Sequence, residues 1–231
     1  MSTQEKRQDQ ASVASQRVAD ELAGQLLSGQ LPPGTRIKQD ELAARLNTSR
    51  IPVRDALRIL ESRGLVTMRA NAGARVASLS MRDLETSYEI RERIEPLLLA
   101  ESIPRLTDAD IEGLARVLAE LEGQPAVDRA VALGREFHEV TYRGHRTPLL
   151  AQMVERLWDV TQSYRRAYVG LARDTGIKAH DMEHWLIFDA IQRREVEPAQ
   201  AALVLHIRHT RTRLLASGHG APDTDAKASA E

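Results

Sequence analysis

The strongest constraint on the fold is a change in the sequence pattern near residue 80. From Met81 to Ala216, apolar residues recur three or four positions apart and no convincing strand pattern interrupts them. This periodicity predicts a bundle of six or seven helices. Before residue 80 the helical segments are shorter, and two extended segments follow them. We therefore expect a mostly α-helical chain with a small N-terminal domain and a larger all-helical C-terminal domain.

The N-terminal domain has the element order of a winged helix-turn-helix. The predicted helices cover residues 13–27, 39–46 and 49–62, and the predicted extended segments cover residues 65–69 and 74–79. Asn71 and Gly73 lie between the extended segments, and both residue types tolerate positive φ, as the tip of a hairpin requires. We expect residues 1–11 to be a flexible arm, 12–79 the winged helix-turn-helix, 80–216 the helical domain and 217–231 a disordered tail.

Composition excludes several classes of protein. The chain has no cysteine, which excludes a disulfide scaffold, a thiolate zinc finger and a cysteine nucleophile, and fits a reducing cytoplasm. No apolar run approaches the length of a membrane span, so we expect no membrane partner. The net charge is −1, but residues 1–79 hold 12 Lys and Arg against 8 Asp and Glu. The basic part is thus confined to the domain expected to meet DNA phosphates.

Three arginines give the third predicted helix a basic stripe. Arg50, Arg54 and Arg58 are spaced four residues apart, and Ser49 precedes them at a position that suits an N-cap. Arginine bridges the acceptors of guanine or binds a phosphate, so a helix that enters the major groove at this end reads DNA. The alternative is a solvated helix face without a DNA partner.

The histidines of the helical domain suggest a second site. His184 and His206 are each about 11 residues from the middle of the predicted turn at residues 192–198. An antiparallel hairpin therefore places them at the same height, where two imidazoles can bind a divalent metal. His138 is a candidate third ligand. The alternative is that each is an ordinary histidine with one hydrogen bond.

The segment from Pro33 to Val76 resembles the winged-helix domain of the GntR family of bacterial regulators. The most specific match is the run Ser-Arg-Ile-Pro-Val-Arg-Asp-Ala-Leu at residues 49–57. The resemblance implies DNA contacts by the following residues of the recognition helix and wing tip: Ser49, Arg50, Ile51, Pro52, Arg54, Asn71 and Gly73. Two residues depart from the family pattern. Asn47 replaces the usual turn glycine, and Asp40 replaces a DNA-facing arginine of some relatives.

Residues 82–216 resemble the helical ligand-binding (FCD-type) domain of the FadR-like branch of that family. Metal-binding members of that branch hold a zinc-like ion through an aspartate and three histidines, and the ion helps to bind a carboxylate effector. His138, His184 and His206 match the histidines, whereas Gly134 occupies the aspartate position. Three imidazoles can still hold zinc or nickel.

Arg91 is the candidate effector-binding residue. It shares a helix flank with apolar residues, so its guanidinium is expected to point inward and to need an anionic partner. The resemblance implies the carboxylate of a small organic acid. The spacing alone equally allows an internal pair with Glu95, four residues on.

These observations predict a transcriptional regulator whose affinity for DNA depends on a small molecule. The resemblance implies a homodimer, which would bind a pseudo-palindromic operator in double-stranded DNA. One rival is an enzyme that activates water at the histidine cluster, but the sequence has no well-placed catalytic carboxylate, phosphate loop or nucleophile–base motif. The other is a protein-interaction module whose winged helix does not touch DNA.

Overall fold

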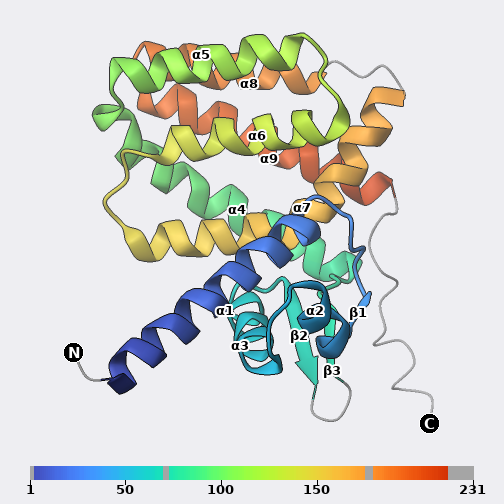
Figure 1. Cartoon of the computed structure of the whole chain (residues 1–231). Helices are drawn as coiled ribbons and strands as arrows, with labels where there is room; N and C mark the ends of the chain where they lie inside the picture. The colour runs from blue at the N-terminus through green and yellow to red at the C-terminus, as the bar shows by residue number, and fades with distance from the viewer. Residues whose placement is uncertain (1–2, 70–72, 175–178, 218–231) are drawn as a thin grey trace. The chain divides into compact units, whose positions relative to one another are not determined.

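The computed structural model describes residues 3–69, 73–174 and 179–217, and the chain divides into two compact units, Met1–Ser78 and Leu79–Glu231. The first unit consists of α1 (Thr3–Leu27), β1 (Arg36–Ile37), α2 (Gln39–Arg45), α3 (Arg50–Ser62), β2 (Val66–Arg69) and β3 (Gly73–Val76), as Figure 1 shows. This order of helices and strands confirms the predicted winged helix-turn-helix.

The turn between α2 and α3 determines where α3 begins. Asn47 has a φ of 47°, in the left-handed region that asparagine tolerates better than most residues. The backbone N–H of Thr48 then donates to the carbonyl of Ala43 at 2.9 Å, which closes the turn. Val53 and Leu57 of α3 are fully buried in the apolar core of this unit. The opposite side of α3 therefore faces solvent.

The wing is a three-stranded antiparallel sheet in the order β1-β3-β2. β2 pairs with β3 so that Arg69 lies opposite Gly73, at the end where the hairpin turns. β1 was not predicted from the sequence, because a strand of two residues is too short to show alternation.

The arm predicted at residues 1–11 needs a correction. Helix α1 begins at Thr3, so residues 3–11 are helical. Their run of Gln, Glu, Lys and Arg contains neither glycine nor proline. Most of these residues favour a helix even where no apolar periodicity indicates one.

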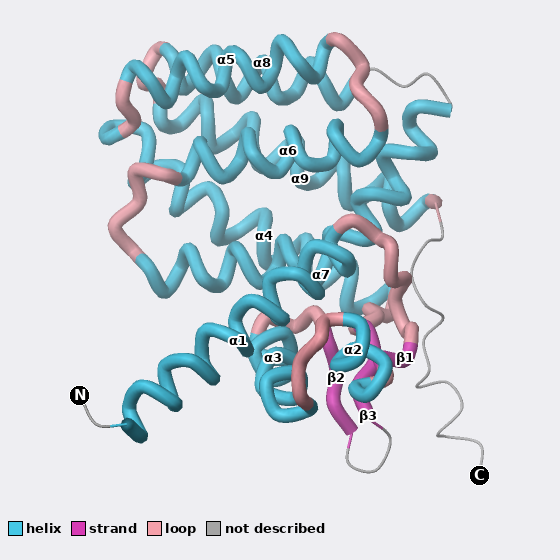
Figure 2. The backbone as a smooth tube through the Cα atoms, viewed as in Figure 1, coloured by secondary structure: helices cyan, strands magenta, loops and turns pink. Residues whose placement is uncertain are grey.

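The second unit is an all-helical bundle (Figure 2). Its described part consists of α4 (Met81–Ser102), the 3-10 helix η1 (Ile103–Arg105), α5 (Asp108–Glu122), α6 (Val127–Tyr142), α7 (Pro148–Asp174), α8 (Ala179–Gln192) and α9 (Val196–Ala216). Six α-helices agree with the predicted six or seven. Helix α9 packs against both α4 and α8, and apolar side chains such as Leu84, Phe137 and Leu203 fill the core.

The hairpin of α8 and α9 turns where the sequence analysis expected it. Arg194, in the connection, has a φ of 60°, and the backbone N–H of Glu195 donates to the carbonyl of Ala190 at 2.9 Å. No helix in the described part of the chain is long and apolar enough to cross a membrane. The predicted tail lies, beyond Ser217, outside the described residues.

Candidate functional site

The first turns of α3 form an exposed basic surface. Arg50 and Arg54 lie one helical turn apart and are exposed, and Ile51 is 63% exposed between them. Arg58 continues the basic stripe, and its Nη1 lies 4.0 Å from Oδ1 of Asp55 at the surface. Because Val53, Leu57 and Leu60 of α3 are buried in the core, the arginines occupy the side of the helix that a DNA groove can reach.

Two residues at the start of α3 differ from expectation. Ser49 occupies the N-cap position, but its side chain makes no capping hydrogen bond, so its exposed hydroxyl is not committed to the helix end. Pro52 was expected at the DNA surface but is buried. Its ring lies on the inner side of the first turn next to Val53, where the missing N–H costs little. We therefore correct Pro52 from a contact residue to a helix-starting residue.

Asp40 of α2 forms an ion pair with Arg50. Both side chains are strongly exposed, at 65% and 74% of their surface. Water screens such a pair, so it orients the guanidinium without fixing it strongly. A carboxylate at the edge of a basic surface also repels phosphate, so Asp40 is unfavourable for a DNA contact by Arg50.

Gly73 is the wing-tip residue that the structure describes. It is exposed and has a φ of 79°, a conformation that a side chain would strain. Asn71, the other predicted wing-tip contact, lies outside the described residues. Arg69 and Arg75 are exposed on the two paired strands, so the described part of the wing carries basic side chains.

The three predicted histidines meet in the interior of the helical unit. One ring nitrogen each of His138, His184 and His206 lies within 4.8 Å of the others, and all three side chains are buried. The ring centroids of His184 and His206 are 4.5 Å apart, as the hairpin argument expected. We call these residues the histidine triad. Three imidazole nitrogens at this separation fit a zinc or nickel ion.

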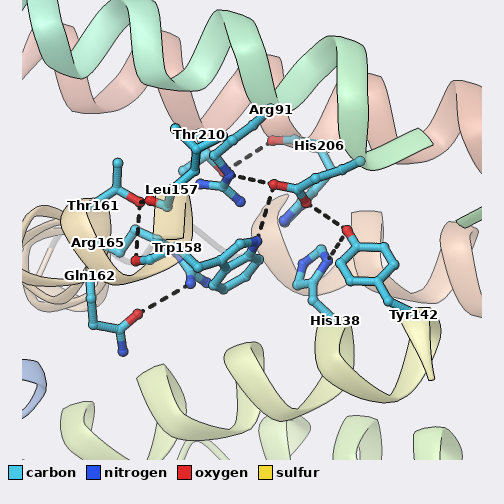
Figure 3. Close-up of polar contacts among 11 residues, drawn as sticks. Arg91, His138, Tyr142, Leu157, Trp158, Thr161, Gln162, Arg165, His206 and Thr210 are labelled. Atoms are coloured by element: carbon cyan, nitrogen blue, oxygen red, sulfur yellow. Dashed lines mark hydrogen bonds and ion pairs between the residues drawn. The ribbon is translucent and has the colours of Figure 1, made fainter. Parts of the chain in front are cut away.

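Hydrogen bonds orient two of the three imidazoles, and Figure 3 shows the one between His138 and Tyr142. Nδ1 of His138 lies 3.3 Å from the hydroxyl of Tyr142, which itself donates to Glu95 at 2.6 Å. Because that hydroxyl proton is used, Nδ1 of His138 is the donor. Its Nε2 then carries a lone pair, and Nε2 is buried without a hydrogen-bond partner among the described residues. This is the state that a metal ligand needs.

Glu183 orients the ring of His206 as Tyr142 orients the ring of His138. Its Oε2 accepts from Nδ1 of His206 at 3.0 Å, and its Oε1 lies 2.6 Å from Nδ1 of His209. Burial, followed by the neighbouring histidines, lowers the pKa of His138 and of His206 well below the ordinary value. Both imidazoles are therefore neutral near pH 7, as metal binding requires.

Glu95 is the centre of a buried polar network. It is fully buried and accepts from Arg91 at 2.5 Å, from Trp158 at 3.1 Å and from Tyr142. Of the two alternatives for Arg91, the structure contains the internal pair with Glu95. Although burial acts against it, Glu95 raises the pKa of Arg91. Nη1 of Arg91 nevertheless has no hydrogen-bond partner within the described part of the chain.

A second buried arginine lies beside this network. Arg165 is 6% exposed, and the carbon of its guanidinium lies 3.8 Å from the centroid of the Trp158 ring. The guanidinium of Arg91 lies 4.5 Å from the same centroid. Figure 3 shows Arg91, His138, Trp158, Arg165 and His206 converging from four helices. The interior thus combines two guanidinium groups with the three imidazoles of the triad.

A cavity adjoins this interior between α6 and α7. It has a volume of about 270 Å³, and its lining includes His138, Tyr142 and Trp158. Arg135 and Arg143 also line it. A space of this size suits a metabolite of a few carbon atoms.

Sequence reasoning missed Tyr142, Trp158, Arg165 and Glu183. Tyr142 follows His138 by four residues and Arg165 follows Trp158 by seven, so each pair shares a helix face. These spacings were visible in the sequence. Their significance was not, because Glu95, the acceptor that joins them, lies 47 residues from Tyr142 and 63 from Trp158.

Comparisons with known proteins cover both units. Residues 14–76 match the family described as bacterial regulatory proteins, gntR family, and residues 86–209 match the FCD domain. The probable D-xylose utilization operon transcriptional repressor of Paenarthrobacter nicotinovorans is 30% identical over 213 residues, which cover 90% of this chain and 91% of that protein. The uncharacterized HTH-type transcriptional regulator YdhC of Bacillus subtilis is 27% identical over 195 residues, 82% of this chain and 86% of that protein.

A solved structure supports the fold. The structure of E. coli McbR/YncC superposes with a TM-score of 0.79 at 22% identity, and the match covers 89% of this chain and 99% of that one. At this level of identity, the likeness concerns the arrangement of the elements and not the ligands.

Proposed function

Because the chain belongs to the GntR family of bacterial transcriptional regulators and carries an FCD domain, we propose that it binds an operator through α3 and the wing under control of a small carboxylate. Membership of the family makes the chain a DNA-binding regulator and not an enzyme. The role of DNA-binding regulator therefore takes the place of the two alternatives considered from the sequence, an enzyme and a protein-interaction module. What remains to be assigned is how each unit contributes to it.

The DNA-contacting residues proposed for α3 are Ser49, Arg50, Ile51 and Arg54. All four are exposed on the first turns of the helix, which is the end that helix-turn-helix proteins insert into the major groove. The arginines read guanine or bind phosphate, and the hydroxyl of Ser49 binds phosphate. The wing tip at Asn71 and Gly73 contacts the backbone or the minor groove. The outward position of Arg50 and Arg54 is the observation that carries this proposal.

A gel shift on the intergenic DNA upstream of the gene tests this assignment. Arg50→Ala and Arg54→Ala are expected to abolish specific binding while the thermal unfolding curve stays unchanged. Arg193→Ala removes an exposed arginine of the helical unit and is the matched control, which should bind as the wild type does. Wild-type affinity in both α3 variants would refute the placement of α3 in the groove.

The proposed effector is a small organic acid bound beside the histidine triad. Nη1 of Arg91 is a buried donor without a partner among the described residues, and a carboxylate oxygen would satisfy it. A zinc or nickel ion held by His138, His184 and His206 would add a Lewis acid that binds a second carboxylate oxygen. The effector changes operator affinity only if it binds the DNA-competent and the incompetent states unequally.

We further propose that the regulator acts in the cytoplasm as a homodimer on a pseudo-palindromic operator. Ile90 and Leu97 support the dimer, because they lie seven residues apart on α4 and remain 37% and 56% exposed. Apolar side chains on one helix face are suited to a second copy of the chain. Light scattering measures the mass in solution: the wild type is expected to be a dimer, and the Leu97→Glu variant a monomer.

A further inference from the structure

Ile51 is an apolar side chain on the otherwise polar, exposed side of α3. It is the second residue of the helix, and 63% of its surface is exposed. In the described part of the first unit, the other large apolar side chain with such exposure is Val13 of α1. A single exposed apolar residue is ordinary on a protein surface. Ile51, however, lies between Arg50 and Arg54, on the surface proposed to enter the major groove.

The two residues that follow Ile51 determine its direction. Pro52 and Val53 are both buried in the core of the unit. Successive side chains of a helix point about 100° apart, so the burial of these two residues turns Ile51 outward. A proline in the first turn restricts the backbone, and a β-branched side chain in a helix has one strongly preferred χ1. Ile51 therefore loses little conformational freedom when it contacts a partner.

The two neighbouring arginines do not cover Ile51. An arginine has an apolar stem that can lie on an apolar neighbour, but Arg50 is paired with Asp40 of α2. Most of the surface of Ile51 stays exposed although Arg50 and Arg54 flank it. Apolar surface in water is unfavourable, and an apolar group that covers it stabilises the complex. On the floor of the major groove, such a group has to come from a base.

Thymine is the base that carries this group. In the major groove its C5 presents a methyl group, whereas the other groups that distinguish the base pairs are hydrogen-bond donors and acceptors. Guanidinium groups bind guanine acceptors or phosphates. An isoleucine between Arg50 and Arg54 therefore complements a thymine that lies next to the bases or phosphates bound by the arginines.

We propose that Ile51 makes the operator half-site specific for a thymine by packing against its 5-methyl group. This inference rests on the proposed function, in which α3 enters the major groove. Cytosine has a hydrogen atom at the same carbon and an amino group beside it, so it offers Ile51 a polar edge. Ile51 is thus a specificity-determining residue, and Arg50 and Arg54 supply the charge-assisted contacts around it.

The test compares two forms of the intergenic DNA upstream of the gene, synthesised with thymine or with deoxyuridine at every thymine position. Deoxyuridine forms the same base pair and lacks the 5-methyl group. Fluorescence-anisotropy titrations of the full chain give the ratio of the two affinities. We expect the wild type to bind the uracil-containing DNA at least about fourfold more weakly, the effect of one methyl group that is no longer buried.

Ile51→Ala isolates the methyl group that Ile51 contacts. The uracil-containing DNA also lacks methyl groups elsewhere, but their loss affects wild type and variant alike and cancels in the double-mutant cycle. The affinity ratio should therefore be at least about fourfold smaller in Ile51→Ala than in the wild type. Val13→Ala removes the other exposed β-branched side chain of the unit and is the matched control, which should keep the wild-type ratio. Thermal unfolding of each variant shows that it is folded.

The outcomes separate this inference from the proposal beneath it. An equal affinity ratio in wild type and Ile51→Ala would overturn the reading of thymine. The placement of α3 in the groove would still stand if Arg50→Ala and Arg54→Ala lose specific binding. If these arginine variants bind as the wild type does, or the wild type shows no specific binding, the placement fails and the inference fails with it. A smaller ratio in Val13→Ala as well would also overturn the role of Ile51.

Discussion

Oε2 of Glu183 accepts a hydrogen bond from Nδ1 of His206 at 3.0 Å, and both side chains are buried. The two residues lie on adjacent helices, α8 and α9, and because this bond uses Nδ1 of His206, Nε2 is the ring nitrogen that a metal on the triad would use. A carboxylate in this position fixes the tautomer of an imidazole and raises its basicity toward a metal.

Glu183→Gln is therefore expected to weaken Zn²⁺ binding by about tenfold, the lower end of what the loss of such a partner costs. The amide keeps the shape of the side chain but removes its charge. Chelator competition at pH 7 measures the change. Glu122→Gln is the matched control, because Glu122 accepts from Trp185 at the exposed surface of the same bundle. An equal loss in both variants would contradict a specific role for Glu183.

Asp40→Asn is expected to tighten operator binding. The substitution frees Arg50 from its ion pair and removes a negative charge from the basic surface. Exposed pairs contribute less than about 1 kcal/mol, so the gain should stay within about fivefold. A fluorescence-anisotropy titration at two salt concentrations measures the gain. The prediction is wrong if affinity falls, which would mean that Asp40 positions Arg50 for contact.

Glu95→Ala is expected to destabilise the helical unit strongly. It removes the carboxylate that accepts from Arg91, Trp158 and Tyr142, and it leaves buried charge uncompensated. Removal of one partner of a buried pair costs about 3–5 kcal/mol. Urea unfolding followed by circular dichroism measures the loss. Asp189→Ala breaks an exposed pair with Arg193 and should cost less than about 1 kcal/mol.

The metal-free protein is expected to lose stability as the pH falls below about 6.5, the histidine pKa in an unfolded chain. Burial holds the pKa of His138 and of His206 well below that value in the folded state. The unfolded chain therefore binds protons that the native state does not, which favours unfolding. Each histidine contributes about 1.4 kcal/mol per pH unit, until the pH reaches its folded pKa.

Urea titrations between pH 7.5 and 5, with a chelator present, measure this slope. The carboxyl groups of Glu101 and Asp110 have lowered pKa values, but an unfolded Glu or Asp binds protons only near pH 4, below this window. His138→Gln should reduce the slope by about one proton. A wild-type stability that stays constant over this range would contradict the buried, neutral state of His138 and His206.

The sequence predicted those features that depend on local periodicity. The order of helices and strands followed from apolar spacing, and equal distances from one turn correctly brought His184 and His206 together. The same reasoning could not tell whether Arg91 pairs within the protein, because a helix face shows which residues turn inward but not what meets them there.

What the sequence could not give depends on contacts between distant helices. Arg165 lies on a helix whose inward face is both polar and apolar, so periodicity gave it no special status. Its importance appears only when Gly134 of α6 and Trp158 are placed beside it. The burial of Pro52 was missed for a related reason: a motif identifies a position without stating which way the side chain points.

Trp158 lies between the two buried guanidiniums and in contact with the ring of His138, at 4.8 Å between centroids. The chain has 2 tryptophans, and the other, Trp185, is hydrogen-bonded to Glu122 at the surface. A Trp185→Phe protein would therefore contain a single tryptophan, buried in the interior of the bundle. The emission wavelength of Trp158 would change when a ligand binds nearby, so metabolites could be screened by tryptophan fluorescence without an attached dye.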